Sequence, residues 1–156
     1  MKVLLAIDGS PCSAAALTEM AARPWPAGTE FKIVTAYELP LMPSPEAWMI
    51  SADYTESLQQ AVLTAQLTLE TARERLNKLL GQSFNVTSEI MAGSPRNAIL
   101  ELAESWNADL IVVGSHGYRA WERFLLGSVS QAVVSHAKCS VEVVRCKDKA
   151  PETSAA

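Results

Sequence analysis

The chain has few aromatic residues, no excess of positive charge and no long apolar run. Aromatic residues make up 6% of its 156 residues, and the formal net charge is −4. A protein that binds nucleic acid through its phosphates needs a basic surface, so this charge balance disfavours a nucleic-acid partner. No run approaches the ~20 apolar residues of a transmembrane helix, which disfavours a membrane protein.

Cysteine is scarce, odd in number and widely spaced. Cys12, Cys139 and Cys146 form no Cys-x-x-Cys pair and no cluster with histidine. This pattern argues against a disulfide scaffold and against a zinc site. Cys12 falls in the first turn of a predicted helix, where the default expectation is a partly buried, inert thiol. We therefore expect a protein of the reducing cytoplasm.

The common phosphate-binding motifs are missing too. Neither Gly-x4-Gly-Lys-Ser/Thr nor Gly-x-Gly-x-x-Gly occurs, which disfavours a P-loop ATPase and a dinucleotide-dependent enzyme. The chain does have 49% hydrophobic residues, enough to fill one core at this length. We expect one domain over residues 1–146. The tail over 147–156 has no apolar period and is predicted to be disordered.

Hydrophobic periodicity predicts five short strands that alternate with four helices. Alternating elements with strands rich in valine, isoleucine and leucine form a parallel sheet with helices on both faces, joined by right-handed crossovers. The fold class is therefore α/β and Rossmann-like. The predicted strands cover about 2–8, 31–37, 84–91, 109–114 and 140–145, and the predicted helices cover 11–22, 52–80, 95–105 and 127–137.

A proline-rich segment over residues 38–49 separates the second strand from the long helix and is too long for a plain connector. Two interpretations stay open. The segment is either a lid or partner surface, or a stiffened excursion whose Trp48 and Met49 pack on the long helix.

Three loops are expected to meet beyond the carboxyl ends of the strands, where doubly wound sheets bind their ligands. They follow the first, second and fourth strands, at residues 8–10, 36–38 and 114–128. Glycines in the third loop would let a phosphate approach the backbone, and the helix predicted from 127 offers N–H groups, two serine hydroxyls and the positive end of its dipole. Taken alone, such a junction is also ordinary turn chemistry.

The glycine loop resembles that of a known family. Gly114, Gly117, Gly127 and Ser128 have the spacing Gly-x2-Gly-x9-Gly-Ser, which is similar to the ATP-binding branch of the universal stress protein family. The similarity extends from Lys2 to Arg145, nearly the whole chain. It implies a single-domain open five-stranded parallel sheet in the order 3-2-1-4-5.

The resemblance implies nine cofactor-binding residues and no catalytic residue. They are Asp8 near the ribose and the phosphates or their metal, Ala36 against adenine, Val113 and Gly114 beside the ribose, Gly117 and Gly127 bordering the phosphates, and Ser128, Val129 and Ser130 on the phosphates. Asp8 would meet Mg²⁺ or Mn²⁺ indirectly, through the nucleotide phosphates. The natural ligand, whether ATP, ADP, AMP or a cyclic adenine dinucleotide, stays open. Arg119, Arg123 and His116 lie in the same loop. Solvated positions are favoured for the two arginines, and a structural or solvent-facing role is favoured for His116 over that of a general base.

Three functions compete. The leading one is a regulatory stress-response protein that binds ATP, hydrolyses it slowly at most and acts as a homodimer. An adenylating or pyrophosphatase-type enzyme would carry a Ser-Gly-Gly-rich loop after the first strand, where this chain has Asp8-Gly-Ser-Pro11. A nucleotide-free dimeric scaffold is disfavoured by the intact glycine spacing.

The dimer prediction rests on the fifth strand. Residues 140–145 are rich in valine, contain no proline or lysine and lie at a sheet edge in the order that the resemblance implies. We expect this edge to pair antiparallel with its copy about a two-fold axis, with Val141 and Val143 or Val144 packing across it.

Overall fold

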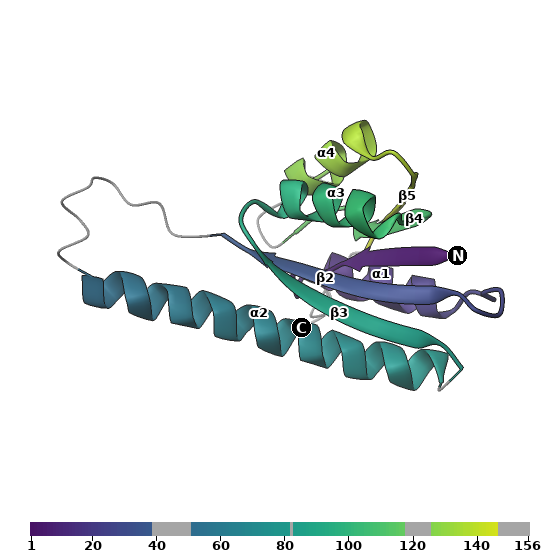
Figure 1. Ribbon diagram of the computed structural model, residues 1–156, viewed down its shortest axis with the longest axis horizontal. Helices are drawn as coiled ribbons and strands as arrows, with labels where there is room; N and C mark the ends of the chain where they lie inside the picture. Colours follow the sequence, from purple (N-terminus) through teal and green to yellow (C-terminus); the bar gives the residue numbers. More distant parts are fainter. Residues whose placement is uncertain (39–50, 82, 118–125, 147–156) are drawn as a thin grey trace, which may run out of the picture.

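The computed structural model describes residues 1–38, 51–81, 83–117 and 126–146, although the side chains of residues 51–53 are not described. Within these ranges strands and helices alternate from one end of the chain to the other (Figure 1). The expectations for the 39–50 segment, for Arg119 and Arg123 and for the tail lie outside the described residues. The elements are β1 (Lys2–Ala6), α1 (Pro11–Ala21), β2 (Glu30–Tyr37), α2 (Ser51–Leu80), β3 (Asn85–Ala92), α3 (Pro95–Trp106), β4 (Leu110–Gly114), α4 (Ser128–His136) and β5 (Ser140–Val144).

The sheet confirms the predicted fold. Its order is β3-β2-β1-β4-β5, and every neighbouring pair is parallel. Val3 of β1 pairs with Phe31 on one side and with Leu110 on the other. The chain winds outward from β1 to β3 and then returns to the other side of β1, so the crossovers diverge between β1 and β4. This is the switch point at which such sheets bind ligands.

Both faces of the sheet are buried, which explains why β1 is apolar from Val3 to Ala6 and β4 from Leu110 to Val113. Val3 and Leu5 of β1 point into a core with α1 and α2, whereas Leu4 and Ala6 point into a second core with α3 and α4. Figure 1 shows α3 and α4 on one side of the sheet and α2 along the other. Within the described ranges, no helix is both long and apolar enough to cross a membrane.

Two helices begin at Ser-Pro pairs, Ser10-Pro11 and Ser94-Pro95. Ser10 is the N-cap of α1, and its Oγ accepts a hydrogen bond from Ser13 N at 3.2 Å. Ser94 occupies the same position before α3. Proline suits the first helical position because its missing N–H would have no partner there. These starts place the amino ends of α1 and α3 at the carboxyl edge of the sheet.

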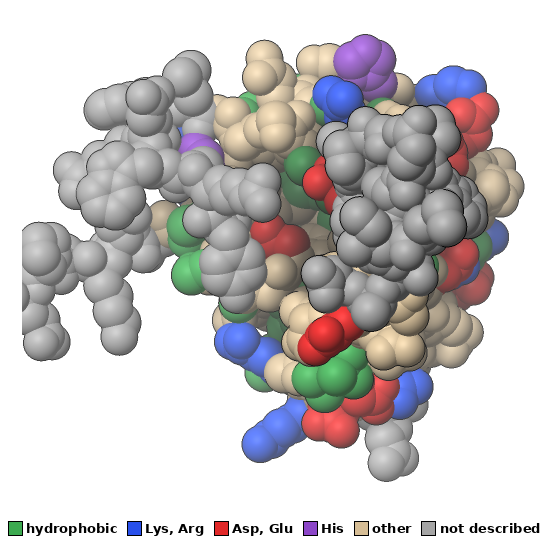
Figure 2. Space-filling model, turned by 90° about the vertical axis from the view of Figure 1, so that its left-hand side faces the viewer, with side chains coloured by type: hydrophobic (Ala, Val, Ile, Leu, Met, Phe, Trp, Pro, Cys, Tyr) green, Lys and Arg blue, Asp and Glu red, His purple; other side chains and the backbone are tan. Residues whose placement is uncertain are grey.

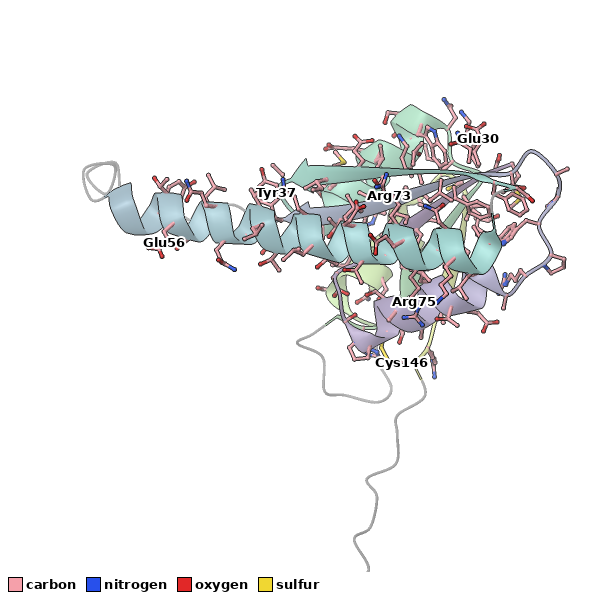
Figure 3. All side chains as sticks on the ribbon, turned by 90° about the horizontal axis from the view of Figure 1, so that it is seen from below. Glu30, Tyr37, Glu56, Arg73, Arg75 and Cys146 are labelled. Carbon is pink, nitrogen blue, oxygen red and sulfur yellow. A yellow bond between two sulfur atoms is a disulfide. The ribbon has the colours of Figure 1, made fainter. Side chains whose placement is uncertain are left out.

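The structure corrects the expectation of unpaired thiols. Cys12 in α1 and Cys146 after β5 form a disulfide, with their Cα atoms 4.7 Å apart. Figure 3 shows Cys146 close to α1. The pairing follows from topology, since α1 packs on β5 as well as on β4. Cys139 is a free cysteine.

Candidate functional site

One cavity is lined by every residue that was predicted to bind the cofactor. It has a volume of about 520 Å³ and lies at the carboxyl ends of β1, β2 and β4, beside the starts of α3 and α4. This volume falls in the usual range for a small-molecule site. Figure 2 looks onto this edge of the sheet and shows acidic and apolar side chains together near its centre. The predicted residues that line the cavity are Asp8, Ala36, Val113, Gly114, Gly117, Gly127, Ser128, Val129 and Ser130.

Asp8 is held by its own turn. Its Oδ1 accepts a hydrogen bond from Ser10 N at 2.9 Å, and Gly9 between them has φ +80°, a conformation that favours glycine. The other carboxylate oxygen faces the glycine loop, because a Cβ added to Gly117 would lie 2.7 Å from Asp8 Oδ2. Glycine at position 117 therefore lets the backbone of the loop approach the Asp8 carboxylate closely.

Gly114 has a packing role that is independent of any ligand. A Cβ here would lie 2.7 Å from the carbonyl carbon of Cys12 and 2.8 Å from Ser13 N. Both are backbone atoms in the first turn of α1, which cannot yield as a flexible side chain would. The end of β4 can approach α1 this closely because position 114 has no side chain.

The amino end of α4 opens into the cavity. Gly127 N donates to Ser115 O at 2.8 Å, and Gln131 N donates to Gly127 O at 2.9 Å as the first helical hydrogen bond. The N–H groups of Ser128, Val129 and Ser130 precede that bond, so they have no acceptor within the helix. With the positive end of the helix dipole, they form an anion-binding arrangement.

The two serines of this turn differ in a way that the sequence did not indicate. Ser130 is buried, and its Oγ donates toward Ser115 O and Gly127 O, each at 2.9 Å. A hydroxyl has one proton, so Ser130 has none left to donate to a ligand. Ser128 is exposed at the cavity. Of the two expected hydroxyl donors, only Ser128 is free to serve.

The opposite wall of the cavity is apolar and includes residues that sequence reasoning missed. Ile99 lies one turn into α3, and Val34 lies on β2. The signal that could have found the α3 residues is the Ser94-Pro95 start, which places this helix at the same edge as α4. The missed lining residues are Ala6, Ile7, Ser13, Val34, Glu38, Pro95 and Ile99.

His116 also lines the cavity. Of the two roles expected for it, structural or solvent-facing, its surroundings fit the structural one. The residue is half-buried, and its Nδ1 lies 3.1 Å from Ser115 Oγ. Its Nε2 is buried and has no hydrogen-bond partner among the described residues. A buried polar atom without a partner is uncommon and suits a ligand that would complete it.

The described residues do not form a metal centre by themselves, since none of them make a group of three or more potential ligands. Mg²⁺ bound to a nucleotide does not need one, because phosphates and water supply most of its ligands and the protein adds one or two carboxylates. Asp8 and Glu38 are the carboxylates among the described residues that line this cavity. The site thus fits a cation that arrives with a phosphate.

A second cavity, of about 810 Å³, lies between the end of β2 and α2. Tyr37 and Glu56 line it, and Figure 3 shows both at this end of the molecule. It shares Asp8, Ala36 and Glu38 with the first cavity but includes no residue of the glycine loop. Its walls therefore lack the helix amino end that favours an anion.

Comparison with known proteins agrees with the fold. The model of the universal stress protein family matches residues 1–145. "Universal stress protein A homolog 2" of Coxiella burnetii is 44% identical over 84 residues, which cover 52% of this chain and 56% of that protein. The chain spans about half the length of the curated relatives that it matches.

Two solved structures are similar over nearly their full length. Universal stress protein UspA from Lactobacillus plantarum has a TM-score of 0.79 and 24% identity, over 93% of this chain and 97% of that one. A universal stress protein in complex with cAMP has a TM-score of 0.64 and 26% identity, over 92% of this chain and 96% of that one.

Proposed function

Because the chain belongs to the universal stress protein family, we propose that it is a regulatory protein that binds an adenine nucleotide, foremost ATP, in the 520 Å³ cavity. The observation that carries this proposal is the meeting of the glycine loop, the open amino end of α4 and an apolar wall in one cavity. The similar structure in complex with cAMP supports an adenine ligand. We also infer that the protein acts in the cytoplasm.

The cavity's two sides suit the two ends of a nucleotide. The apolar wall with Val34, Ala36 and Ile99 suits the flat face of adenine. Val113 packs in the same apolar cluster as Val34 and Ile99 and directly precedes the glycine loop. The phosphates would lie at α4, where the backbone N–H groups of residues 128–130 are free of the helix. In this pose Gly117 and Gly127 let the phosphates approach the backbone closely.

We propose binding with slow turnover at most. A divalent cation would join the phosphates and Asp8, which Gly117 allows the loop to approach. Rapid phosphoryl transfer needs a positioned base and fixed cations on the charge that develops. The chain has no P-loop lysine, and the carboxylate of Asp8 already accepts a hydrogen bond from Ser10. These features favour a sensor of nucleotide over an enzyme.

Calorimetry tests this function. The full chain is titrated with ATP, ADP, AMP and GTP in the presence of magnesium, and we expect heat with the adenine nucleotides and weaker binding of GTP. A protein concentration of about 100 µM detects affinities down to the weak end of the useful range. Absence of binding by every adenine nucleotide under these conditions would contradict the proposal.

Ser128→Ala should weaken ATP binding by roughly ten- to a hundred-fold, because it removes a hydroxyl donor to a charged group, worth about 1.5–3 kcal/mol. Ser130→Ala is the matched variant, since its hydroxyl bonds the protein. It should lower the free energy of unfolding by about 1 kcal/mol and change affinity less. Calorimetry and urea unfolding measure the two effects. Equal losses of affinity would show that the phosphates do not meet the Ser128 hydroxyl.

We also propose that the protein forms a homodimer through the exposed edge of β5. β5 pairs with β4 at the edge of the sheet. Ser140 N donates to Asp109 O and Val144 O accepts from Ser115 N, so the even-numbered residues of β5 turn their polar backbone groups toward β4. In a parallel ladder the residues between them point the other way, which directs the N–H groups of Val141 and Val143 outward.

Val143→Pro should therefore weaken the dimer at least about ten-fold while the pairing of β5 with β4 persists, because proline removes an outward donor. Val143→Thr keeps that donor and the branched shape and should remain dimeric. Sedimentation equilibrium at tens of micromolar measures both variants. A parent chain that sediments as a monomer at this concentration would refute the β5 dimer.

A further inference from the structure

The second cavity, of about 810 Å³, has a chemistry that differs from that of the nucleotide cavity. Its walls are the carboxyl end of β2, at residues 35–38, and the part of α2 between residues 56 and 68, with Asp8 at one side. Figure 1 shows that the amino end of α2 extends past the carboxyl end of β2. The cavity therefore lies beside a stretch of helix that the sheet does not fully cover.

A buried hydroxyl without a partner lines the sheet side of this cavity. Thr35 is 4% exposed, and it lies on the same face of β2 as Ile33, which packs in the core with α2. Its Oγ1 makes no hydrogen bond to any residue that the structure describes. A polar group that is removed from bulk water normally has a hydrogen-bond partner. The Thr35 hydroxyl thus indicates a ligand in the cavity that it lines.

The charged groups of the cavity are all hydrogen-bond acceptors. Asp8, Glu38 and Glu56 are carboxylates, and none of them forms an ion pair within the described parts of the chain. The Oγ1 of Thr64 donates its proton to Gln60 O at 2.8 Å, so toward a ligand it can only accept. The described lining includes no lysine, arginine or histidine. These groups favour a ligand that donates hydrogen bonds and carries positive charge.

The separation of the carboxylates argues against a single metal ion. No three potential ligands among the described residues are grouped closely enough to hold one. The lining of α2 runs from Glu56 to Thr68, which corresponds to about 18 Å of helix. Separate negative charges along a long cavity match a chain molecule whose positive charges are also separated.

Small apolar side chains complete the cavity. Ala61 and Ala65 lie on the α2 wall, and Ala36 lies at the end of β2. Their methyl groups leave space for a ligand and offer it an apolar contact, which suits the methylene groups between charged nitrogens.

We propose that this cavity binds a linear aliphatic polyamine. Its ammonium groups would meet the carboxylates of Glu38 and Glu56, one nitrogen would donate to the Thr35 hydroxyl, and its methylene groups would contact Ala61 and Ala65. Each ammonium replaces hydration water by acceptors that have no other cation to bind.

The polyamine site adjoins the nucleotide site without depending on it. Asp8, Ala36 and Glu38 line both cavities, whereas the glycine loop lines only the nucleotide cavity. The carboxylates and Thr35 attract the amine whether or not a nucleotide is present. Binding of the amine can therefore be measured without nucleotide, separately from the proposed function.

Calorimetry of the full chain with spermidine, in the absence of nucleotide and magnesium, is the first test. A low salt concentration of about 20 mM limits the screening of exposed carboxylates. We expect saturable binding of one spermidine per chain with a dissociation constant of about 1 mM or lower. Triethylene glycol, a neutral chain with acceptor oxygens, should not bind. Absence of saturable spermidine binding, or equal binding of the neutral chain, would overturn the proposal.

Two matched variants of α2 separate the cavity from the net charge. Glu56 and Glu74 are both exposed on this helix, but only Glu56 lines the cavity. Glu56→Gln should weaken spermidine binding roughly three- to ten-fold, the effect of losing one exposed partner of an ammonium. Glu74→Gln removes the same charge and should bind nearly as the parent does. Equal affinities of the two variants would show that spermidine follows net charge, which contradicts a site in the cavity.

Thr35→Val tests the buried hydroxyl with little change of shape. It should weaken spermidine binding roughly three- to ten-fold without lowering the urea concentration at which the chain unfolds, because no hydrogen bond among the described residues is lost. Thr35→Ser keeps the hydroxyl and should bind spermidine more tightly than Thr35→Val. Unchanged affinity in Thr35→Val would overturn the proposed site. Failure of ATP to bind in the earlier titration, with spermidine still bound in this pattern, contradicts the proposed function alone.

Discussion

Replacing Gly127 by valine should reduce ATP affinity at least about 100-fold and leave the fold largely intact. Gly127 lines the cavity as the N-cap of α4, with φ −60°, which valine can adopt. A Cβ there would already lie 3.3 Å from His116 Cα and from Ser115 O. The two methyl groups of valine extend further, so they either displace the 115–116 backbone or fill the space where a phosphate approaches the helix.

Two variants make this result specific. Gly127→Ala adds only the Cβ and should lose affinity by a smaller factor, because neighbours at 3.3 Å need to shift by a few tenths of an ångström. Ser135→Val places the same branched side chain on an exposed position of α4 and should bind ATP as the parent does. Calorimetry measures affinity, and thermal unfolding checks the fold. Undiminished ATP binding by Gly127→Val would place the nucleotide elsewhere.

Much of the fold could be predicted because its signals are local. The strand and helix periods alternate clearly, and two Ser-Pro pairs mark helix starts that the structure retains at Ser10 and Ser94. Element bounds differ from those expected by only one or a few residues. The sheet order came from the family resemblance, since strand pairing depends on distant contacts that periodicity does not contain.

The candidate site was predictable only where it lies on strand-to-helix junctions. Topology places the carboxyl ends of β1, β2 and β4 together, so residues such as Asp8, Ala36 and Gly114 had to meet near one edge. The position of Ile99 in the apolar wall depends on the angle at which α3 crosses the sheet. A single sequence contains no information on distant contacts and does not give that angle. The sequence therefore indicated the phosphate side of the cavity more fully than its apolar side.

The disulfide and the histidine show a second kind of limit. Cys12 and Cys146 are separated by 134 residues and belong to different motifs, so spacing does not indicate their pairing. His116 looked like one more polar residue of an exposed loop. Its half-buried position follows from the hydrogen bond between its ring and the hydroxyl of buried Ser115, a contact between adjacent residues that loop composition does not predict.

Gly114→Ala should lower the free energy of unfolding by about 1–3 kcal/mol, the usual range for overpacking a filled interior. The added methyl group would lie 2.7 Å from the carbonyl carbon of Cys12 and 2.9 Å from its oxygen. These atoms belong to the first turn of α1, so relief requires that turn to move away from the end of β4. Urea unfolding at a fixed protein concentration measures the loss, since a dimer would make apparent stability depend on concentration.

Gly127→Ala is the matched control for this last variant, because both changes add one methyl group to a glycine of the same loop. Its nearest neighbours lie at 3.3 Å instead of 2.7 Å, so it should cost less than 1 kcal/mol of stability. The two glycines should thus differ in kind: position 114 is needed for α1 to pack on the sheet, and position 127 for the phosphate to reach α4. If Gly114→Ala unfolds at the same urea concentration as the parent, α1 adapts to the added methyl group, and the glycine at 114 is to be explained by the ligand instead.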